Sequence, residues 1–147
     1  MQDHSAMDSL IGTYRELNAK VRPLPEDRLR LSSDNTSVRE VVSRMRDSEL
    51  RFSQALKERI TGVPIPDMFD ENEVPVVGTE GSDDSTAVLL SQFGTAREST
   101  LAMLRSLTEE DWDKPLAGDK PIRGGIQELV DNDRRQMERI VSLLGAP

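Results

Sequence analysis

Apolar residues recur every three or four positions in four stretches of the chain, which predicts four long helices. These stretches cover residues 4–21, 36–62 and about 85–107, and a last one that begins between Ile122 and Gly125 and ends at Gly145. Pro23 follows the first stretch, and a proline disfavours helix at the residue before it. We therefore expect the first helix to end near residues 22–25.

Residues with known capping preferences stand at several predicted helix ends. Ser37 and Glu40 form an S-x-x-E pattern at the start of the second helix, which is typical of a capping box. Gly62 suits the C-terminal cap of that helix. Residues 82–84 offer N-cap candidates for the third helix, and their acids suit the positive end of a helix dipole.

Little other regular structure is expected. Thr108-x-x-Asp111 predicts one extra turn, with Trp112 packing back on the bundle, whereas the proline in VPVVG at 74–78 disfavours the only β-like run. The connector at 63–84 is long, because helix connections in bundles usually have ~2–8 residues. Such a crossover lets the second and third helices be neighbours without being antiparallel partners. The predicted fold is all-α: a four-helix bundle with a long acidic crossover loop between helices two and three.

The composition of the chain limits the kinds of functional site that it can form. The 147 residues fit a single domain over residues 1–147. The absence of cysteine excludes thiolate zinc sites, iron–sulfur clusters, disulfides and cysteine nucleophiles. The net charge is −8, and residues 63–85 hold seven acids and no base. Because an acidic surface repels phosphate backbones, we expect no nucleic-acid partner.

The chain is expected to be cytoplasmic and not to associate with a membrane. No apolar run approaches the roughly 20 residues that span a bilayer. The start, MQDHSAMDSL, lacks the basic region and apolar core of a signal peptide.

Charged residues fall within the apolar stripes. Arg44 and Glu49 belong on or beside the inner face of the second helix, and Asp133 lies among the apolar positions of the last one. A buried unpaired charge costs several kcal/mol. We therefore expect either an Arg44–Asp133 pair or an Arg44–Glu49 pair, with help from Asn132 or Gln136. These five residues form the candidate ligand-binding site.

Two other interpretations of these charges stay open. Charged residues at the ends of an inner face often reach out to water, and Glu49 can then pair with Arg46 or Arg51 on the surface. Alternatively, Asp47, Glu49 and Asp133 supply paired carboxylates for acid–base chemistry. Because carboxylates beside an arginine are more often structural, we assign no catalytic residue.

Three segments resemble the DinB-like (YfiT-like) family of four-helix bundles. They are SVREVVSRMRDSELRF at 37–52, LTEEDWDKP at 107–115 and LVDNDRRQMERIVSLLG at 129–145, in the family's order, and the likeness extends from about residue 7 to 145. The resemblance implies a metal site with three histidines, which commonly binds nickel or zinc. Typical members carry one of these histidines on the second helix and two on the last.

The matching positions hold Arg44, Asn132 and Gln136, and the only histidine is His4. Amides and a guanidinium cannot replace three imidazoles, and the permanent charge of Arg44 repels a cation. We therefore expect no metal and no cofactor, with ionic and amide side chains filling the space of the family's metal.

Three functional hypotheses follow. The favoured one is a metal-free DinB-like protein that acts as a binding or interaction protein, as a homodimer. The second is an enzyme, similar to thiol-dependent transferases or hydrolases, with a metal-free or relocated site around Arg44 that holds a small anionic ligand such as a carboxylate. The third is a bundle unrelated to this family, which an up-down-up-down topology would support.

Overall fold

The computed structural model describes residues 4–62, 84–117 and 120–145. Four long helices dominate these residues: α1 (His4–Lys20), α3 (Val38–Thr61), α4 (Thr86–Ser106) and α6 (Ile122–Gly145). Two short helices, α2 (Glu26–Leu29) and α5 (Glu109–Trp112), lie in the connections. The prediction of a helical protein is confirmed for this part of the chain, while the connector at 63–83 and the run at 74–78 lie outside it.

The capping signals act largely as predicted. The hydroxyl of Ser37 accepts a hydrogen bond of 3.2 Å from the backbone N–H of Glu40, and Gly62 ends α3 with a positive φ of 73°. The cap of α4 is Ser85, whose hydroxyl accepts from the N–H of Val88 at 3.2 Å. The N-cap candidates at 82–84 were therefore wrong, because a serine one position later has the extended backbone that an N-cap needs.

The segment between α4 and α6 contains both an expected and an unexpected element. Thr108 and Asp111 form a complete capping box at α5, and Trp112 is fully buried. A small antiparallel hairpin follows, β1 (Pro115–Ala117) and β2 (Lys120–Pro121), where no strand was predicted. In a strand this short, proline costs few ladder hydrogen bonds.

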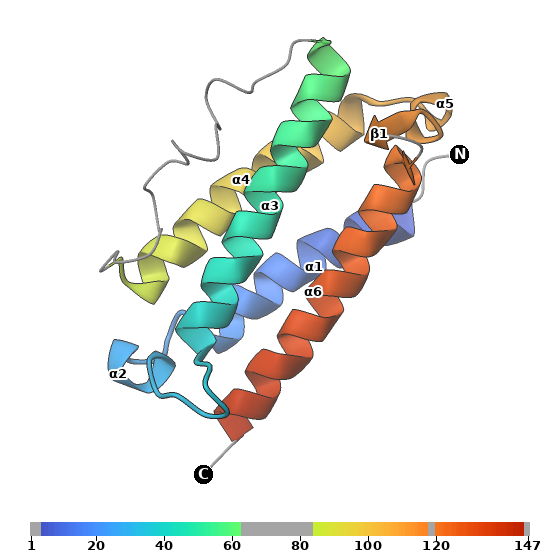
Figure 1. Ribbon diagram of the computed structural model, residues 1–147. Coiled ribbons are helices and arrows are strands. Elements are labelled where there is room, and N and C mark those ends of the chain that lie inside the picture. Colours follow the sequence, from blue (N-terminus) through green and yellow to red (C-terminus); the bar gives the residue numbers. More distant parts are fainter. Residues whose placement is uncertain (1–3, 63–83, 118–119, 146–147) are drawn as a thin grey trace.

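The long helices form a bundle in which α3 and α4 run in the same direction (Figure 1). They start at one end of the bundle, where Arg39 on α3 donates at 2.7 Å to the carbonyl of Asp84 just before α4. α6 returns in the opposite direction beside α3, and α1 contacts both α6 and α4. The up-down-up-down topology expected of an unrelated bundle is therefore absent from this part of the chain.

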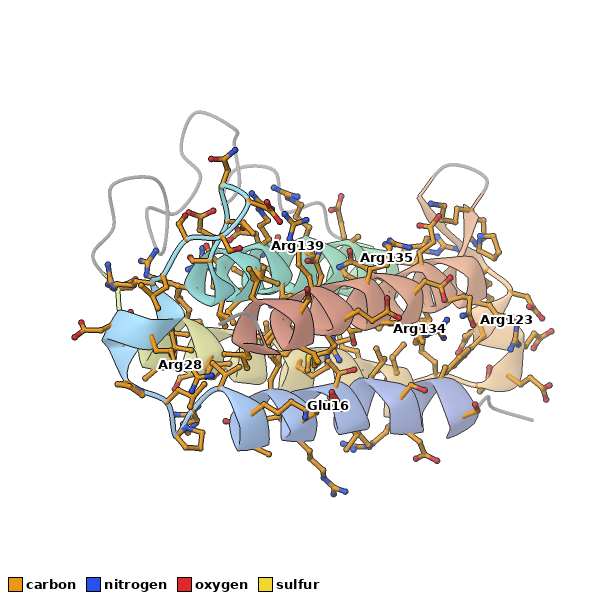
Figure 2. The ribbon with its side chains drawn as sticks, turned by 90° about the horizontal axis from the view of Figure 1, so that it is seen from below. Glu16, Arg28, Arg123, Arg134, Arg135 and Arg139 are labelled. Atoms are coloured by element: carbon orange, nitrogen blue, oxygen red, sulfur yellow. The ribbon has the colours of Figure 1, made fainter. Side chains whose placement is uncertain are left out.

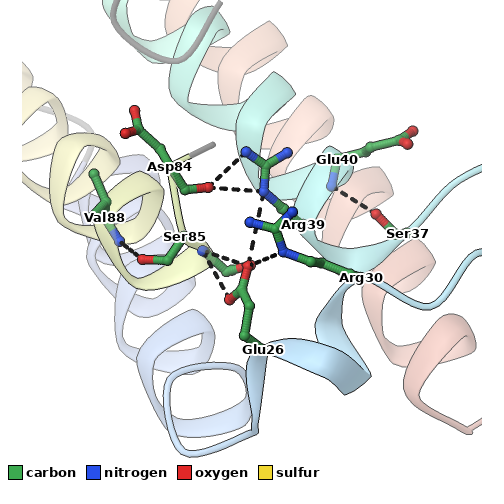
Figure 3. A network of polar contacts seen from close by, with 9 residues as sticks. Glu26, Arg30, Ser37, Arg39, Glu40, Asp84, Ser85 and Val88 are labelled. Atoms are coloured by element: carbon green, nitrogen blue, oxygen red, sulfur yellow. Dashed lines mark hydrogen bonds and ion pairs between the residues drawn. The ribbon is translucent and has the colours of Figure 1, made fainter. Parts of the chain in front are cut away.

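α2 contacts the end of α6 and the start of α4. Arg28, which Figure 2 labels, donates to the carbonyl of Leu144 near the end of α6 at 3.0 Å, a contact that the figure does not mark. The carboxylate of Glu26 accepts from the backbone N–H of Thr86, at 3.0 and 3.1 Å, and from Arg30 at 2.8 Å (Figure 3). α2 thus supplies a second cap to the start of α4.

None of the described helices combines the length and the hydropathy needed to cross a bilayer.

Candidate functional site

A charged layer divides the interior into two apolar clusters. One cluster includes Leu10, Leu56, Leu101 and Ile126, and the other includes Leu17, Met45, Phe93 and Met137. Between them, in the middle of the bundle, lie three buried charged residues from three helices: Glu49 of α3, Arg97 of α4 and Asp133 of α6. We call these three residues the ionic cluster.

Arg97 is the centre of the ionic cluster. Its Nη1 donates to Oδ2 of Asp133 at 2.9 Å and to the carbonyl of Leu10 in α1 at 2.7 Å. Its Nη2 donates to Oε1 of Glu49 at 2.8 Å and to Oδ1 of Asp133 at 3.1 Å. One guanidinium thereby connects all four long helices, and its face lies 4.8 Å from the ring centroid of Phe93.

Burial and pairing have opposite effects on Arg97. Burial disfavours its charge, but the neighbouring carboxylates of Glu49 and Asp133 outweigh that effect and raise the pKa of Arg97 above its ordinary value. The guanidinium therefore stays charged. One cation and two carboxylates give the ionic cluster a formal charge of −1 when both acids are ionised.

Two atoms of the ionic cluster have no hydrogen-bond partner among the described residues. They are Oε2 of Glu49 and Nε of Arg97, both fully buried. Asp133, in contrast, uses both of its oxygens. The two acids are thus held unequally by the same cation.

The expected role of Arg44 was wrong. Glu49 and Asp133 are buried, as their positions predicted, but Arg44 is exposed and their cation is Arg97. Glu49 lies 11 residues after Val38, close to three full turns, whereas Arg44 lies six residues after it and falls well off the stripe. The surface alternative for Glu49 was also wrong, because Arg46 pairs with Asp47 at 2.6 Å instead.

The sequence contained a signal for Arg97. It lies four residues after Phe93 and four before Leu101, both on the apolar stripe of α4. This is the same spacing that indicated an inward position for Asp133 between Leu129 and Met137. A long, flexible arginine on a stripe can also reach out to water, so spacing alone did not identify it as buried.

Asn132 and Gln136 lie beside the ionic cluster rather than in it. Both are half-buried on α6, and Nε2 of Gln136 donates to Oδ1 of Asn132 at 3.4 Å. Asn132 also lines a groove of about 590 Å³ between α3 and α6, together with Arg51 of α3 and Arg135 of α6. Arg44 is not among the residues that line this groove, so no polar groups converge on it there.

The residues at the family's metal positions do not fit a nickel or zinc ion. These positions hold the cation Arg44 and the amides Asn132 and Gln136. A guanidinium and two amides do not form a ligand set for nickel or zinc. Within residues 4–62, 84–117 and 120–145, no three His, Cys, Asp or Glu side chains gather closely enough to hold a metal ion.

Catalysis by the buried carboxylates would need contact with a substrate. Glu49 has no exposed surface and Asp133 has 3%. Both are hydrogen-bonded to Arg97, so their charge is already engaged. Asp47 pairs with Arg46 on another side of α3, and the three acids do not form a common site.

Comparison of this chain with protein-family models, with curated proteins and with solved structures finds no match. The resemblance to the DinB-like family therefore stays a prediction.

Proposed function

We propose that this chain is a metal-free DinB-like helical bundle that acts by binding, with a second copy of itself as its partner. Support for the family comes from four long helices with one long connection between α3 and α4. Action by binding rather than by catalysis is supported by the bundle interior. There the carboxylates of Glu49 and Asp133 are buried and paired with Arg97, so they are not placed to act on a substrate.

The observation that supports this partner is an outer face on α3 and α4 that is lined mainly by small or neutral side chains. A groove of about 760 Å³ lies there, and its lining contains no carboxylate. The side chains that α4 contributes to it are small or neutral: Ala87, Val88, Ser91, Gln92, Thr95, Ala96 and Ser99. Val88 is 41% exposed, although it is a large apolar residue.

The charge of the chain favours a second copy at this face. Two copies with a net charge of −8 repel each other wherever their acids meet. The charged residues that line the α3–α4 groove are two cations, Arg22 and Lys57, so no acids of the groove lining meet when two copies associate there. Small side chains such as Ala87 and Ser91 also let another helix approach closely.

The face is large enough for a specific contact. The 21 residues of α4 span about 31 Å, and two adjacent helices present a width of about 20 Å. The resulting patch of roughly 600 Å² approaches the ~800 Å² that each partner buries in a standard interface.

The mass of the whole chain in solution tests this proposal. We expect a dimer by light scattering coupled to size exclusion, and a monomer for the double variant Ser91→Arg, Thr95→Arg, because four further cations then meet at the interface. The matched control is Ser9→Arg, Thr13→Arg, a Ser/Thr pair with the same spacing on α1, which should stay dimeric. A monomeric parent chain, or equal effects of the two double variants, would refute self-association through α3 and α4.

A further inference from the structure

We propose that the groove between α3 and α6 binds a small organic anion through Arg51 and Arg135. The groove measures about 590 Å³ and is lined by residues of both helices. That size is in the range of small-molecule sites, roughly 300–1,000 Å³. The site lies on α3 and α6, whereas the proposed dimer face lies on α3 and α4, so each proposal can fail without the other.

The side chains of the two cations that line the groove have no ionic or hydrogen-bonding partner among the described residues. Arg51 and Arg135 are both exposed, and neither side chain forms a hydrogen bond or ion pair with another described residue. Arg135 leaves α6 on the side of α3, whereas its neighbour Arg134 lines a different groove, between α1 and α6 (Figure 2). Two guanidiniums therefore border one groove with their donors available.

The acids of the same groove are already engaged elsewhere. Both oxygens of Glu128 accept from Nζ of Lys120, at 2.7 and 2.6 Å. Oδ1 of Asp131 accepts from Gln127 at 3.1 Å and lies 3.9 Å from Nη2 of Arg134. The cations Lys120 and Arg134 partly offset the negative charge beside Arg51 and Arg135, so the groove can attract an anion although the chain as a whole is acidic.

The remaining lining indicates the kind of anion. Ser48 and Asn132 offer neutral hydrogen-bonding groups, and Oδ1 of Asn132 already accepts from Gln136, which leaves its amide N–H groups to donate. Phe52 and Leu129 supply apolar surface to the same lining. Guanidiniums bind carboxylates and phosphates with two parallel hydrogen bonds. The fitting ligand therefore has an oxyanion at one end and a small apolar body, as in an aromatic carboxylate or an aromatic phosphate ester.

Calorimetry with three anionic probes distinguishes a carboxylate ligand from a phosphate ligand. Benzoate, phenyl phosphate and inorganic phosphate are titrated into the full chain at low salt, with benzamide as the uncharged analogue of benzoate. We expect at least one of the aromatic anions to bind more tightly than benzamide, and the preferred anion to report whether the site favours a carboxylate or a phosphate. Inorganic phosphate should bind more weakly than phenyl phosphate, because it lacks the apolar body.

Charge-removing variants locate the site. Arg51→Gln and Arg135→Gln should each weaken binding of the preferred anion by at least about tenfold. Arg139→Gln, which removes a cation one turn later on α6 and outside the groove lining, should change it by less than about twofold (Figure 2). The Ser91→Arg, Thr95→Arg chain should bind as the parent does, since α4 does not line this groove.

Three results would overturn the proposal. They are the absence of binding by both aromatic anions, equal losses in all three arginine variants, and amide chemical shifts that change outside α3 and α6. A monomeric parent chain that still binds benzoate or phenyl phosphate at this groove would refute the dimer and leave the anion site standing.

Discussion

The two acids of the ionic cluster differ in how many of their oxygens are satisfied, and this predicts unequal roles. In Asp133→Asn one oxygen that accepts from Arg97 becomes an amide donor facing another donor. In Glu49→Gln the oxygen that accepts can remain, and the amide nitrogen takes the place of the unpartnered Oε2. Both changes bring the formal charge of the ionic cluster from −1 to zero, so the two variants differ only in their hydrogen bonds.

We therefore expect Asp133→Asn to lower the free energy of unfolding by about 2–4 kcal/mol, and Glu49→Gln by no more than about 1 kcal/mol. Urea unfolding at neutral pH measures both. Asp131→Asn is the control, because this neighbouring acid on α6 lies outside the ionic cluster and should change the value by less than about 0.5 kcal/mol. Equal losses for Glu49 and Asp133 would show that the unpartnered oxygen has no energetic meaning.

At the residue scale, the sequence predicted the inward positions of Glu49 and Asp133 correctly, but it placed the exposed Arg44 inward and did not identify their partner. Glu49 and Asp133 were placed by helical period alone, which is a local property. The cation that meets them depends on which helix faces them, and this is a property of the packed bundle. Arg44 is near Glu49 in the chain, but Arg97 is the residue that the packing of α4 brings to it.

Helix packing predicts opposite outcomes for two glycines in helices. A Cβ added at Gly94 of α4 would overlap the hydroxyl of Tyr14 on α1 and lie 2.8 Å from its ring carbon Cε1. A Cβ at Gly12 of α1 would meet no heavy atom within 4 Å. Gly94 thus permits the close approach of α1 and α4.

Gly94→Ala should destabilise the chain by about 1–3 kcal/mol, because the rigid tyrosine ring has to move. Gly12→Ala should stabilise it by about 0.5–1 kcal/mol, because alanine restricts the unfolded chain and favours helix. Thermal unfolding of the two variants beside the parent checks the signs. A shift in the same direction for both would contradict this account of the α1–α4 contact.

The cap that α2 supplies to α4 predicts a pH dependence. Burial tends to raise the pKa of Glu26, but the N–H of Thr86 and the side chain of Arg30 outweigh it and hold that pKa below its ordinary value of 4.5. A lowered pKa in the folded state means that the contribution is complete above about pH 4.5 and is lost as the pH falls through the folded value.

Glu26→Gln should therefore cost about 1 kcal/mol at neutral pH, and the difference from the parent should shrink as the pH falls below about 4.5. Urea unfolding at several pH values measures this difference. Glu16→Gln on the exposed side of α1 serves as the control and should leave the stability nearly unchanged at each pH. A pH-independent loss for Glu26→Gln would show that its charge does not contribute.

At the element scale, most helix ends could be predicted from the local sequence, whereas the long-range contacts that support them could not. Ser37, Gly62 and the Thr108–Asp111 pair act within one turn of the helix that they cap, so their spacing was sufficient. Glu26 caps α4 from 60 residues away, and no local pattern reveals such a contact. The hairpin of β1 and β2 was missed for a similar reason, because its stability comes from packing against α3 and α6.

For the whole molecule, the ionic cluster is expected to specify the bundle more than to stabilise it. Removal of Arg97 alone leaves two buried carboxylates without a cation, so Arg97→Met should cost about 3–5 kcal/mol. The triple variant Arg97→Met, Glu49→Leu, Asp133→Leu removes all three charges together and should be as stable as the parent, or more stable by about 1–4 kcal/mol. Urea unfolding compares the three chains.

The arrangement of the helices in the triple variant provides the second measurement. The hydrogen bonds of Arg97 with Glu49, Asp133 and the carbonyl of Leu10 fix the register of the four long helices relative to one another. Without these bonds, we expect broader amide resonances, because purely apolar stripes can slide past one another. A triple variant that is much less stable than the parent would show that the ionic cluster contributes net stability.

By itself, the sequence determined four helices, most of their caps and the inward positions of Glu49 and Asp133. Each of these depends on residues within a few turns of one another, so periodicity and capping preferences suffice. The tertiary structure alone decided that α3 and α4 run side by side in one direction, that Arg97 replaces Arg44 as the buried cation, and that Arg51 and Arg135 border one groove. These features join residues far apart in the chain, and the free energy that selects them comes from packing and charge pairing between helices rather than within one.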